Sequence, residues 1–527
     1  MKRRVLTVFS LLILCFCFLG YRTADIGTRV QSAQSASQGI RLDISELRGT
    51  VYDCNMKPLT NAVTAYCAVA KPTLRAMSAL EKELDSVVFS SVRKILASGD
   101  PVAVEVKDES TRGEDIKVVS YPKRYSGIAA HIIGYLGYDG GGVSGIEKSF
   151  DGLLSQNGFS LYARVDANAD GRVLFGEEPE IINNAFPTAG VVLTVDKEIQ
   201  QIVEDAIDSS GAECAAAVVI EVGTGAVRAC VSRPTFDPYN ISDVLDDENS
   251  PLLNRAFQAF SVGSVFKPVV AAYALECGVS SDYSYECKGS VTLNGVTFNC
   301  HKKDGHGVLN MEEAVAQSCN TYFISLAVKV GGNGIIGMAK KFGFGEQSVF
   351  GESMKTRSGN LPEKVDSKAA TANLSFGQGE LTATPVQICS MMATIANGGT
   401  YIRPYLVEGE ADENGNLTRK SGYAERKQIV SRKTAEMLRR FLCAVVERGS
   451  GSRARSDAVT CAGKTATAQT GKSENGAEIY NAWFAGYFPA QEPEYAVVVL
   501  CENGGEGAVS CAPIFKMIAE KTAELGS

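Results

Sequence analysis

The sequence is poor in histidine and has no strongly basic segment beyond its first few residues. Only 3 of its 527 residues are histidines, and no G-x-S-x-G elbow surrounds Ser264, the best candidate nucleophile. A serine triad needs a histidine placed to activate its serine, so this mechanism is disfavoured. The formal net charge is −8, whereas proteins that bind nucleic acid carry a basic stripe or patch. Nucleic acid is therefore not an expected partner.

Cysteine is abundant, yet its pattern does not indicate a disulfide framework. The chain has 15 cysteines, an odd number, of which Cys15 and Cys17 lie in the N-terminal apolar run and most others lie in apolar segments. Such cysteines behave as small buried hydrophobic residues. Disulfide-dense folds are typically small secreted domains, unlike this chain.

Residues 1–22 are expected to form a membrane anchor. A Lys-Arg-Arg start precedes the apolar run Val5–Tyr21, which suits a signal peptide or a short anchor with a cytoplasmic N-terminus. Small residues at 33–35 fit a cleavage site but lie far beyond the run, so a retained anchor is favoured. Residues 22–40 are rich in Gln, Ser and Ala, and we expect a polar spacer there. The bulk of the chain is exported in either case.

The length and the element pattern indicate two or three domains of α+β class. A second domain is expected to begin near Gly190, with helices enclosed between strands from both of its ends. The strands expected from alternating or continuous apolar patterns are 191–195, 216–220, 226–231, 461–469, 482–487 and 495–500.

Two segments of the N-terminal third have readable patterns. Residues 72–98 show the apolar spacing of one helix. Asp166–Gly171, followed by Glu177, fits the twelve-residue calcium loop. That loop joins two helices, whereas residues 159–165 alternate like a strand, so a polar hairpin turn is the favoured interpretation.

Ser264 and Lys267 are spaced to work together. In a helix their i, i+3 spacing places hydroxyl and amine on one face. Pro268 has no N–H to give to the Ser264 carbonyl, so Ser264 is expected at a helix start. A lysine among apolar groups can lose its charge and take the serine proton. The spacing alone is weak evidence, because Ser91 and Lys94 share it in an ordinary solvated helix.

Two further tripeptides complete a set. Ser318-Cys-Asn320 lies between predicted helices, where side chains can project into a cleft, and Lys464-Thr-Ala466 lies in a strand of small residues. Other S-x-N and K-T-A stretches occur in polar loops or helical patterns. Small side chains let an extended peptide pair with the strand edge.

The ordered set S-x-x-K, S-x-N and K-T-x resembles that of penicillin-binding proteins and class A β-lactamases. Over nearly its full length the chain resembles a class B penicillin-binding protein, a monofunctional peptidoglycan D,D-transpeptidase. The stretches that carry this wider resemblance are Arg48–Asp53, His131–Gly134, Gly145–Glu147, Pro251–Ala256, Gly305–Gly307, Gly377–Gly379, Thr384–Pro385 and Trp483–Gly486.

The resemblance implies roles for the motif residues in acyl transfer. Ser264 would attack the D-Ala-D-Ala carbonyl and form an acyl-enzyme, which is also how β-lactams would bind. Lys267 would be the base, and Ser318 would relay the proton to the leaving D-alanine. The N–H groups of Ser264 and Thr467 would form the oxyanion hole.

The remaining implied roles concern substrate binding. Asn320 would hold the donor's amide side, Lys464 and Thr465 would bind its terminal carboxylate, and Thr467 would line the same strand. No cofactor is implied.

The family resemblance also implies the architecture and the partners. It places an anchor at 1–22, a non-catalytic pedestal at 23–185, and a transpeptidase domain with an antiparallel sheet and a helical subdomain at 186–527. The protein would cross the cell membrane once and work beside a SEDS-family glycosyltransferase. A β-lactamase would need no pedestal, so that alternative is disfavoured.

Three departures from the family pattern stand out: Cys54–Met56 replaces Arg-Asn-Gly, Val262 replaces Pro, and Ala466 replaces Gly. The methyl of Ala466 intrudes where substrate backbone approaches. It leaves open an alternative function as a β-lactam sensor or scaffold with little turnover.

Four potential ligands precede the second motif: Cys287, Cys300, His301 and His306. The cysteines flank residues 290–298, which fit a hairpin turning at Asn-Gly, and facing cysteines can form a disulfide. Free thiols and a zinc site are the alternatives. Adjacent Cys300 and His301 are poorly spaced as ligands of one ion, so the disulfide is favoured and no metal is expected.

Overall fold

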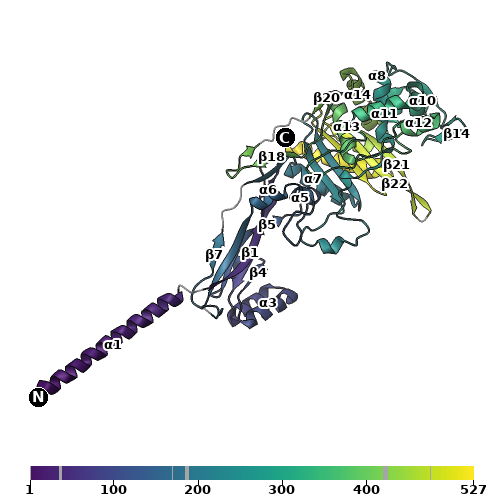
Figure 1. The fold of residues 1–527 in the computed structure, drawn as a ribbon. Coiled ribbons are helices and arrows are strands. Elements are labelled where there is room, and N and C mark those ends of the chain that lie inside the picture. The colour runs from purple at the N-terminus through teal and green to yellow at the C-terminus, as the bar shows by residue number, and fades with distance from the viewer. Residues whose placement is uncertain are drawn as a thin grey trace. The chain divides into compact units, whose positions relative to one another are not determined.

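The computed structural model describes residues 2–34, 38–168, 170–183, 189–418, 425–474 and 476–526. The chain forms two compact units (Figure 1). The first unit comprises Met1–Gly49, Thr60–Ser126 and Asn157–Pro187, and the second comprises Thr50–Leu59, Gly127–Gln156 and Thr188–Ser527. The predicted boundary between residues 185 and 186 lies outside the described residues. Two segments expected in the pedestal, 50–59 and 127–156, belong to the second unit.

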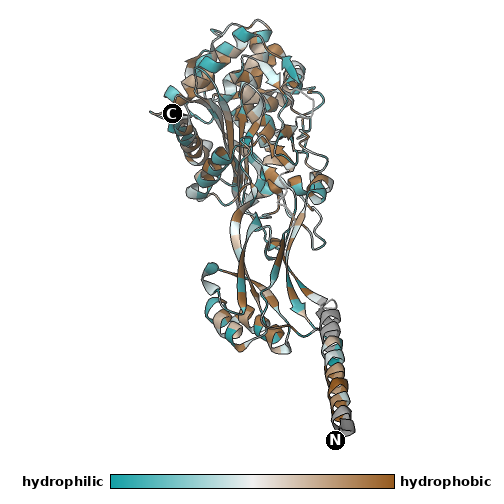
Figure 2. Ribbon diagram, turned by 90° about the vertical axis from the view of Figure 1, so that its left-hand side faces the viewer, coloured by the Kyte–Doolittle hydropathy of each residue, from teal (hydrophilic) through white to brown (hydrophobic). Residues whose placement is uncertain are grey.

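The first unit begins with the long helix α1 (Lys2–Gln34). Its segment Val8–Asp25 is apolar and long enough to cross a membrane, and none of it is buried. Brown, hydrophobic residues mark this part of α1 in Figure 2. The helix suggests a single-pass membrane anchor. It continues past residue 22 into the predicted spacer, and Ser35 of the candidate cleavage site lies outside the described residues.

The rest of the first unit consists of two three-stranded sheets and a helical pair. One sheet has the order β1-β6-β7 and the other β4-β3-β5. Their strands are β1 (Gln38–Leu47), β3 (Thr60–Ala70), β4 (Val102–Val106), β5 (Ile116–Tyr125), β6 (Phe159–Ala167) and β7 (Glu180–Asn183).

The prediction of one continuous helix over residues 72–98 is wrong. The structure has two helices, α2 (Leu74–Glu83) and α3 (Ser86–Ser98). The Asp85 side chain accepts hydrogen bonds from the N–H groups of Val87 and Val88. This N-cap starts a new helix and interrupts the apolar period.

The calcium-loop pattern follows a strand, as expected for the hairpin interpretation. Strand β6 leads into a turn in which the Asn168 side chain accepts the N–H groups of Asp170 and Arg172. Ala167 and Val173 then form a β-bridge. Ala169 lies outside the described residues.

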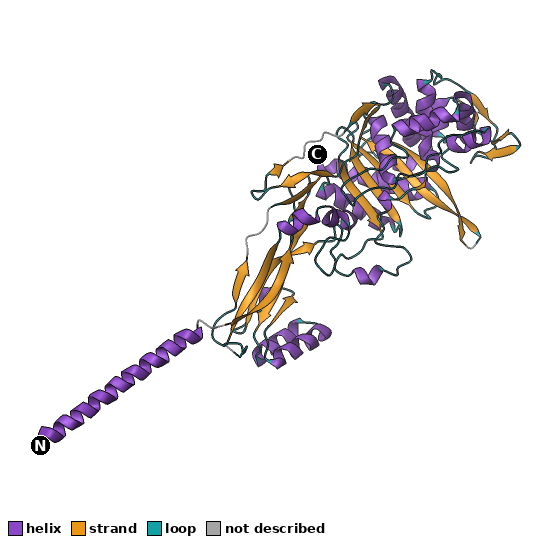
Figure 3. Ribbon diagram, in the orientation of Figure 1, coloured by secondary structure: helices purple, strands orange, loops and turns teal. Residues whose placement is uncertain are grey.

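An antiparallel five-stranded sheet forms the centre of the second unit, in the order β10-β9-β23-β22-β21. Strands from both ends of the unit therefore meet in one sheet, which confirms the α+β prediction (Figure 3). The strands are β9 (Ala215–Glu221), β10 (Val227–Arg233), β21 (Ala462–Glu474), β22 (Ala477–Phe488) and β23 (Tyr495–Cys501).

Helices cover both faces of this sheet. Helices α7 (Lys197–Ser210) and α15 (Gly507–Leu525) bury a large apolar cluster against one face. Helix α13 (Pro385–Ala396) packs on the other face, where the Cys389 thiol donates to the Val218 and Ala496 carbonyls. Further elements of the unit are β2 (Thr50–Tyr52), α4 (Ala130–Ile133), α5 (Gly145–Ser149), α6 (Asp151–Gln156), β8 (Gly190–Leu193), β11 (Phe260–Ser261), α11 (Gly332–Lys341), α12 (Lys368–Ser375), β16 (Thr382–Ala383), β17 (Thr400–Ile402), β18 (Val407–Ala411), β19 (Leu417–Thr418), β20 (Arg426–Gln428) and α14 (Arg432–Arg448).

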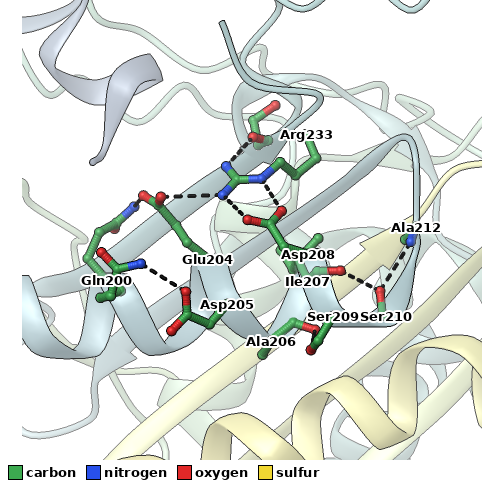
Figure 4. A network of polar contacts seen from close by, with 12 residues as sticks. Gln200, Glu204, Asp205, Ala206, Ile207, Asp208, Ser209, Ser210, Ala212 and Arg233 are labelled. Atoms are coloured by element: carbon green, nitrogen blue, oxygen red, sulfur yellow. Dashed lines mark hydrogen bonds and ion pairs between the residues drawn. The ribbon is translucent and has the colours of Figure 1, made fainter. Parts of the chain in front are cut away.

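A polar network links α7 to the end of β10 (Figure 4). The Arg233 guanidinium donates to Asp208 at 2.6 and 2.9 Å and to Glu204 at 3.3 Å. Glu204 also accepts from the Gln200 side chain and from the Ala129 N–H. The network therefore joins the segment near residue 129 to the sheet.

The segment Thr50–Leu59 belongs to the second unit because β2 pairs with β8 in parallel. The Asp53 carboxylate accepts the N–H groups of Asn55, Lys57 and Lys197. Residues Cys54–Met56, which differ from the family pattern, therefore form a turn that the Asp53 carboxylate stabilises.

Candidate active site

Ser264 lies in a 3₁₀ turn, η4 (Gly263–Phe266), that leads directly into α8 (Lys267–Glu276). Pro268 occupies the first turn of α8, and the Lys267 N–H bonds the Ser264 carbonyl. The expected helix start is confirmed. The Ser264 side chain stays partly exposed, whereas Lys267 is fully buried one turn further on.

Lys267 is held by oxygen atoms of the second motif. Its Nζ donates to the Ser318 carbonyl at 2.6 Å, to Ser318 Oγ at 3.2 Å and to Asn320 Oδ1 at 2.7 Å. None of the described carboxylates pairs with it. Burial lowers the pKa of Lys267 from its usual 10.5 to about 7. A lysine in this state can accept a proton near neutral pH.

Ser318 occupies the link between α9 (Met311–Ala316) and α10 (Asn320–Val330). A capping box formed by Asn310 and Glu313 starts α9. Ser318 itself adopts φ +55°, an unusual conformation for a residue other than glycine. This sharp link turns its side chain and the side chain of Asn320 toward Lys267.

Lys464 of the third motif also contacts Ser318. Its Nζ donates to Ser318 Oγ at 2.9 Å and to the Thr465 carbonyl at 3.0 Å. Burial, and then the charge of Lys267, lowers the pKa of Lys464 well below its ordinary value. Ser318 Oγ accepts from both lysines, which uses its two lone pairs and leaves its O–H to donate elsewhere.

The third motif lies on β21, the edge strand of the central sheet. A Cβ placed on Gly263 would lie 3.1 Å from Ala468 Cβ and 3.4 Å from the Thr467 carbonyl oxygen, so the η4 turn that carries Ser264 packs against β21. Ala466 is 4 % exposed and shares a strand face with Ala468 and Lys464, because strand side chains alternate. The methyl of Ala466 therefore lies on the side of the strand that faces the η4 turn.

Two family-like stretches hold the η4 turn and the strand before it in place. The Gly263 N–H donates to the Gly377 carbonyl at 2.9 Å, and a Cβ at Gly377 would lie 2.0 Å from the Gly263 oxygen. The Trp483 indole donates to the Ser261 carbonyl at 2.9 Å. The short distance from Gly377 to the Gly263 oxygen leaves no room for a side chain, so position 377 requires glycine.

Ser450 also belongs to this group of residues, although the sequence does not predict it. Its hydroxyl shares a 3.0 Å hydrogen bond with Thr465 Oγ1, next to Lys464. Ser450 follows α14 and stands between two glycines. Only the fold brings it to the third motif, and no sequence pattern signals this.

The predicted Cys287–Cys300 disulfide is absent, because both residues are free thiols in the structure. The predicted hairpin is present, with β13 (Ser290–Leu293) and β14 (Val296–Asn299) joined at Asn294 and Gly295. Both of these turn residues have positive φ, as such a turn requires.

Comparisons with known proteins agree with this geometry. The transpeptidase family described as "Penicillin binding protein transpeptidase domain" matches residues 215–520. The chain is 27% identical over 545 residues to stage V sporulation protein D of Bacillus subtilis, covering 95% of this chain and 82% of the relative. It is 27% identical over 597 residues to peptidoglycan D,D-transpeptidase MrdA of Acinetobacter baumannii, covering 98% and 87%. It is 32% identical over 425 residues to penicillin-binding protein PbpB of Mycolicibacterium smegmatis, covering 75% and 64%.

A solved structure gives the same result. Penicillin binding protein 3 of Mycobacterium tuberculosis, complexed with aztreonam, superposes with a TM-score of 0.66 at 26% identity, covering 92% of this chain and 97% of that chain. The family match spans more than half of the sequence. The chain therefore belongs to the penicillin-binding protein transpeptidase family and, within it, to the class B D,D-transpeptidases.

Proposed function

We propose that this protein cross-links peptidoglycan stem peptides through a serine acyl-enzyme on Ser264, and that β-lactams acylate the same serine. The observation that carries the proposal is the Lys267–Ser318–Lys464 hydrogen-bonded group beside the nucleophile turn. Both lysines are fully buried, and none of the described acidic side chains neutralises them. Such lysines favour the neutral form that a base needs.

The acylation step follows from these positions. Ser264 Oγ attacks the carbonyl carbon of the penultimate D-alanine while its proton passes to neutral Lys267. The C–N bond to the terminal D-alanine then breaks, and Ser318 donates its proton to the departing amine. Lys267 reprotonates Ser318 through their 3.2 Å hydrogen bond. An acceptor amine later attacks the ester and frees Ser264, which completes the transfer.

The developing oxyanion would be bound by the N–H groups of Ser264 and Thr467. The carbonyl of Thr467 lies on the side of the nucleophile turn. In an extended strand the N–H and C=O of one residue point to the same side, so the Thr467 N–H is directed there too. Backbone donors of this kind stabilise charge that forms during acyl transfer.

The donor peptide would add to the open edge of β21. This strand pairs with β22 on one side and is the last strand of its sheet. Lys464 and Thr465 would bind the terminal carboxylate, with Ser450 holding the Thr465 hydroxyl. Asn320 would receive the donor's amide side. Strand addition of this type gains main-chain hydrogen bonds.

Acylation by a fluorescent penicillin tests the assignment of Ser264. Mass spectrometry of the purified full chain should show one adduct, on the peptide that contains Ser264. Ser264→Ala should abolish labelling. Ser91→Ala is the matched control, because Ser91 has the same S-x-x-K spacing on the exposed face of α3 and should leave labelling unchanged. Stoichiometric labelling of Ser264→Ala would refute the assignment.

A sensor or scaffold with little turnover is the second candidate, and the methyl of Ala466 favours it. The two functions differ in the fate of the acyl-enzyme. A transpeptidase releases D-alanine repeatedly from a D-Ala-D-Ala peptide when an acceptor amine is present. A sensor releases about one equivalent and stops.

The orientation and the partner are also proposals. We place the N-terminus of α1 in the cytoplasm and the second unit outside the membrane, because Lys and Arg precede the apolar run. A SEDS-family glycosyltransferase is the proposed partner, contacted through α1 and the first unit, where Leu74, Val87 and Ile95 are exposed. Secretion of a chain cleaved near residue 35 would contradict the anchored topology, and failure of the two proteins to co-purify from membranes would contradict the partnership.

A further inference from the structure

Four potential metal ligands from separate segments meet beside the second motif. They are Cys287 at the end of β12 (Tyr285–Cys287), Cys300 after β14, His306 before β15 (Gly307–Leu309), and Cys319. Their ligand atoms all lie within 4.8 Å of one another. The three cysteines are 2, 3 and 0 % exposed.

The separations match the edges of a tetrahedral zinc site. Zinc bonds of about 2.3 Å to sulfur and about 2.05 Å to nitrogen require edges of about 3.8 Å between two sulfurs and about 3.6 Å between sulfur and nitrogen. The Cys300 and Cys319 sulfurs are 3.9 Å apart, and Cys300 Sγ is 3.6 Å from His306 Nδ1. A disulfide needs sulfurs about 2.05 Å apart, so these thiols have the spacing of ligands around one ion.

The chemistry of the ligand set selects the ion. Three thiolates and one imidazole form a Cys₃His set, which structural zinc sites use. Hard cations such as calcium and magnesium prefer oxygen ligands. In the sequence, adjacent Cys300 and His301 are poorly spaced as ligands of one ion. In the structure the fourth ligand is Cys319 and not His301, so this difficulty does not arise. Cys319 is distant in sequence from Cys287, and only the fold brings the two together.

We propose that Cys287, Cys300, His306 and Cys319 bind one structural Zn²⁺ that fixes the position of the second motif. Cys319 stands between Ser318 and Asn320, whose oxygens bond Lys267. The Asn320 side chain also donates to the Asn299 carbonyl, next to the ligand Cys300, at 3.3 Å. A metal bound here would anchor the β13–β14 hairpin to Ser318 and Asn320.

Metal analysis of the full chain, purified in detergent without chelators, tests the site. Elemental mass spectrometry should find about one zinc per chain, and X-ray absorption should show about three sulfurs and one nitrogen at zinc–ligand distances. His306→Ala and Cys287→Ser should lose most of this zinc. His301→Ala is the matched control, because His301 is exposed and its ring lies 5.0 Å from that of His306, yet it is outside the ligand group. It should keep the zinc.

Metal removal from the wild-type protein covers the case in which a ligand variant fails to fold. Chelation should lower the melting temperature and expose three alkylatable thiols, and added Zn²⁺ should reverse both changes. Slower penicillin acylation of the zinc-free protein would show the effect on the second motif. Metal content does not depend on acylation, so the two proposals can fail separately. Absence of stoichiometric zinc, a disulfide among these cysteines, or equal zinc loss in His301→Ala would overturn the proposal.

Discussion

The second unit buries cationic side chains in two contrasting ways. Arg233 lies between two acids, Glu204 and Asp208, and links helix α7 to the sheet. Lys267 and Lys464 are buried more completely, but their described partners are neutral oxygens. A paired cation keeps its charge and contributes structure, whereas an unpaired buried lysine loses affinity for its proton. The contrast distinguishes Arg233, a structural cation, from Lys267, the proposed base.

Exchanging the reactive cation should have the largest effect. Lys267→Arg keeps a positive charge, but arginine cannot be deprotonated in proteins and so cannot act as the base. Penicillin acylation should slow by about 10²–10⁴-fold, the usual contribution of a general base. Lys94→Arg, at the equivalent position of the solvated S-x-x-K pattern, is the control and should acylate normally. A rate near that of the wild type in Lys267→Arg would mean that another group is the base.

Removing the structural cation should affect stability instead. Arg233→Met leaves Glu204 buried without its cationic partner, which should cost about 3 kcal/mol of unfolding free energy, the lower end for a broken buried pair because Asp208 is half-exposed. Urea unfolding measures this. Arg164→Met breaks the exposed pair with Glu180 and should cost less than about 1 kcal/mol. A similar loss in both variants would remove the distinction between the two kinds of pair.

Acidification should slow the acylation of Ser264. Burial lowers the pKa of Lys267 to about 7, so the lysine is increasingly protonated below that pH and cannot accept the serine proton. The acylation rate constant should fall by about tenfold per pH unit below 7 and level off above it. A rate that stays flat for about two units below 7 would show that neutral Lys267 is not required.

The smallest effect expected is that of the methyl on β21. Ala466→Gly should speed acylation by an amount equivalent to about 1–3 kcal/mol, since it removes a group that crowds the substrate backbone. Ala468→Gly on the same strand face is the control and should not accelerate the reaction. Unchanged or slower acylation in Ala466→Gly would mean that the cleft has adapted around the methyl.

The motifs and the main sheet could be predicted from sequence because local patterns encode them. The Ser264 turn follows from Pro268, and the hairpin follows from Asn294 and Gly295. Features that depend on distant packing could not be predicted. Ser450 contacts Thr465, and Cys319 lies beside Cys287, only because the tertiary fold brings these segments together. The alternation or periodicity of apolar residues does not indicate which distant residues come into contact.

The left-handed conformation of Ser318 links stability to activity at one residue. A positive φ costs a non-glycine residue about 1–3 kcal/mol, so glycine would relieve the backbone at this position. Glycine would also remove the oxygen that both Lys267 and Lys464 contact. Selection for thermal stability alone would therefore favour Ser318→Gly, a variant that is inactive under the proposed mechanism. The second motif gives up folding free energy for catalysis, and consensus stabilisation of this enzyme has to leave it untouched.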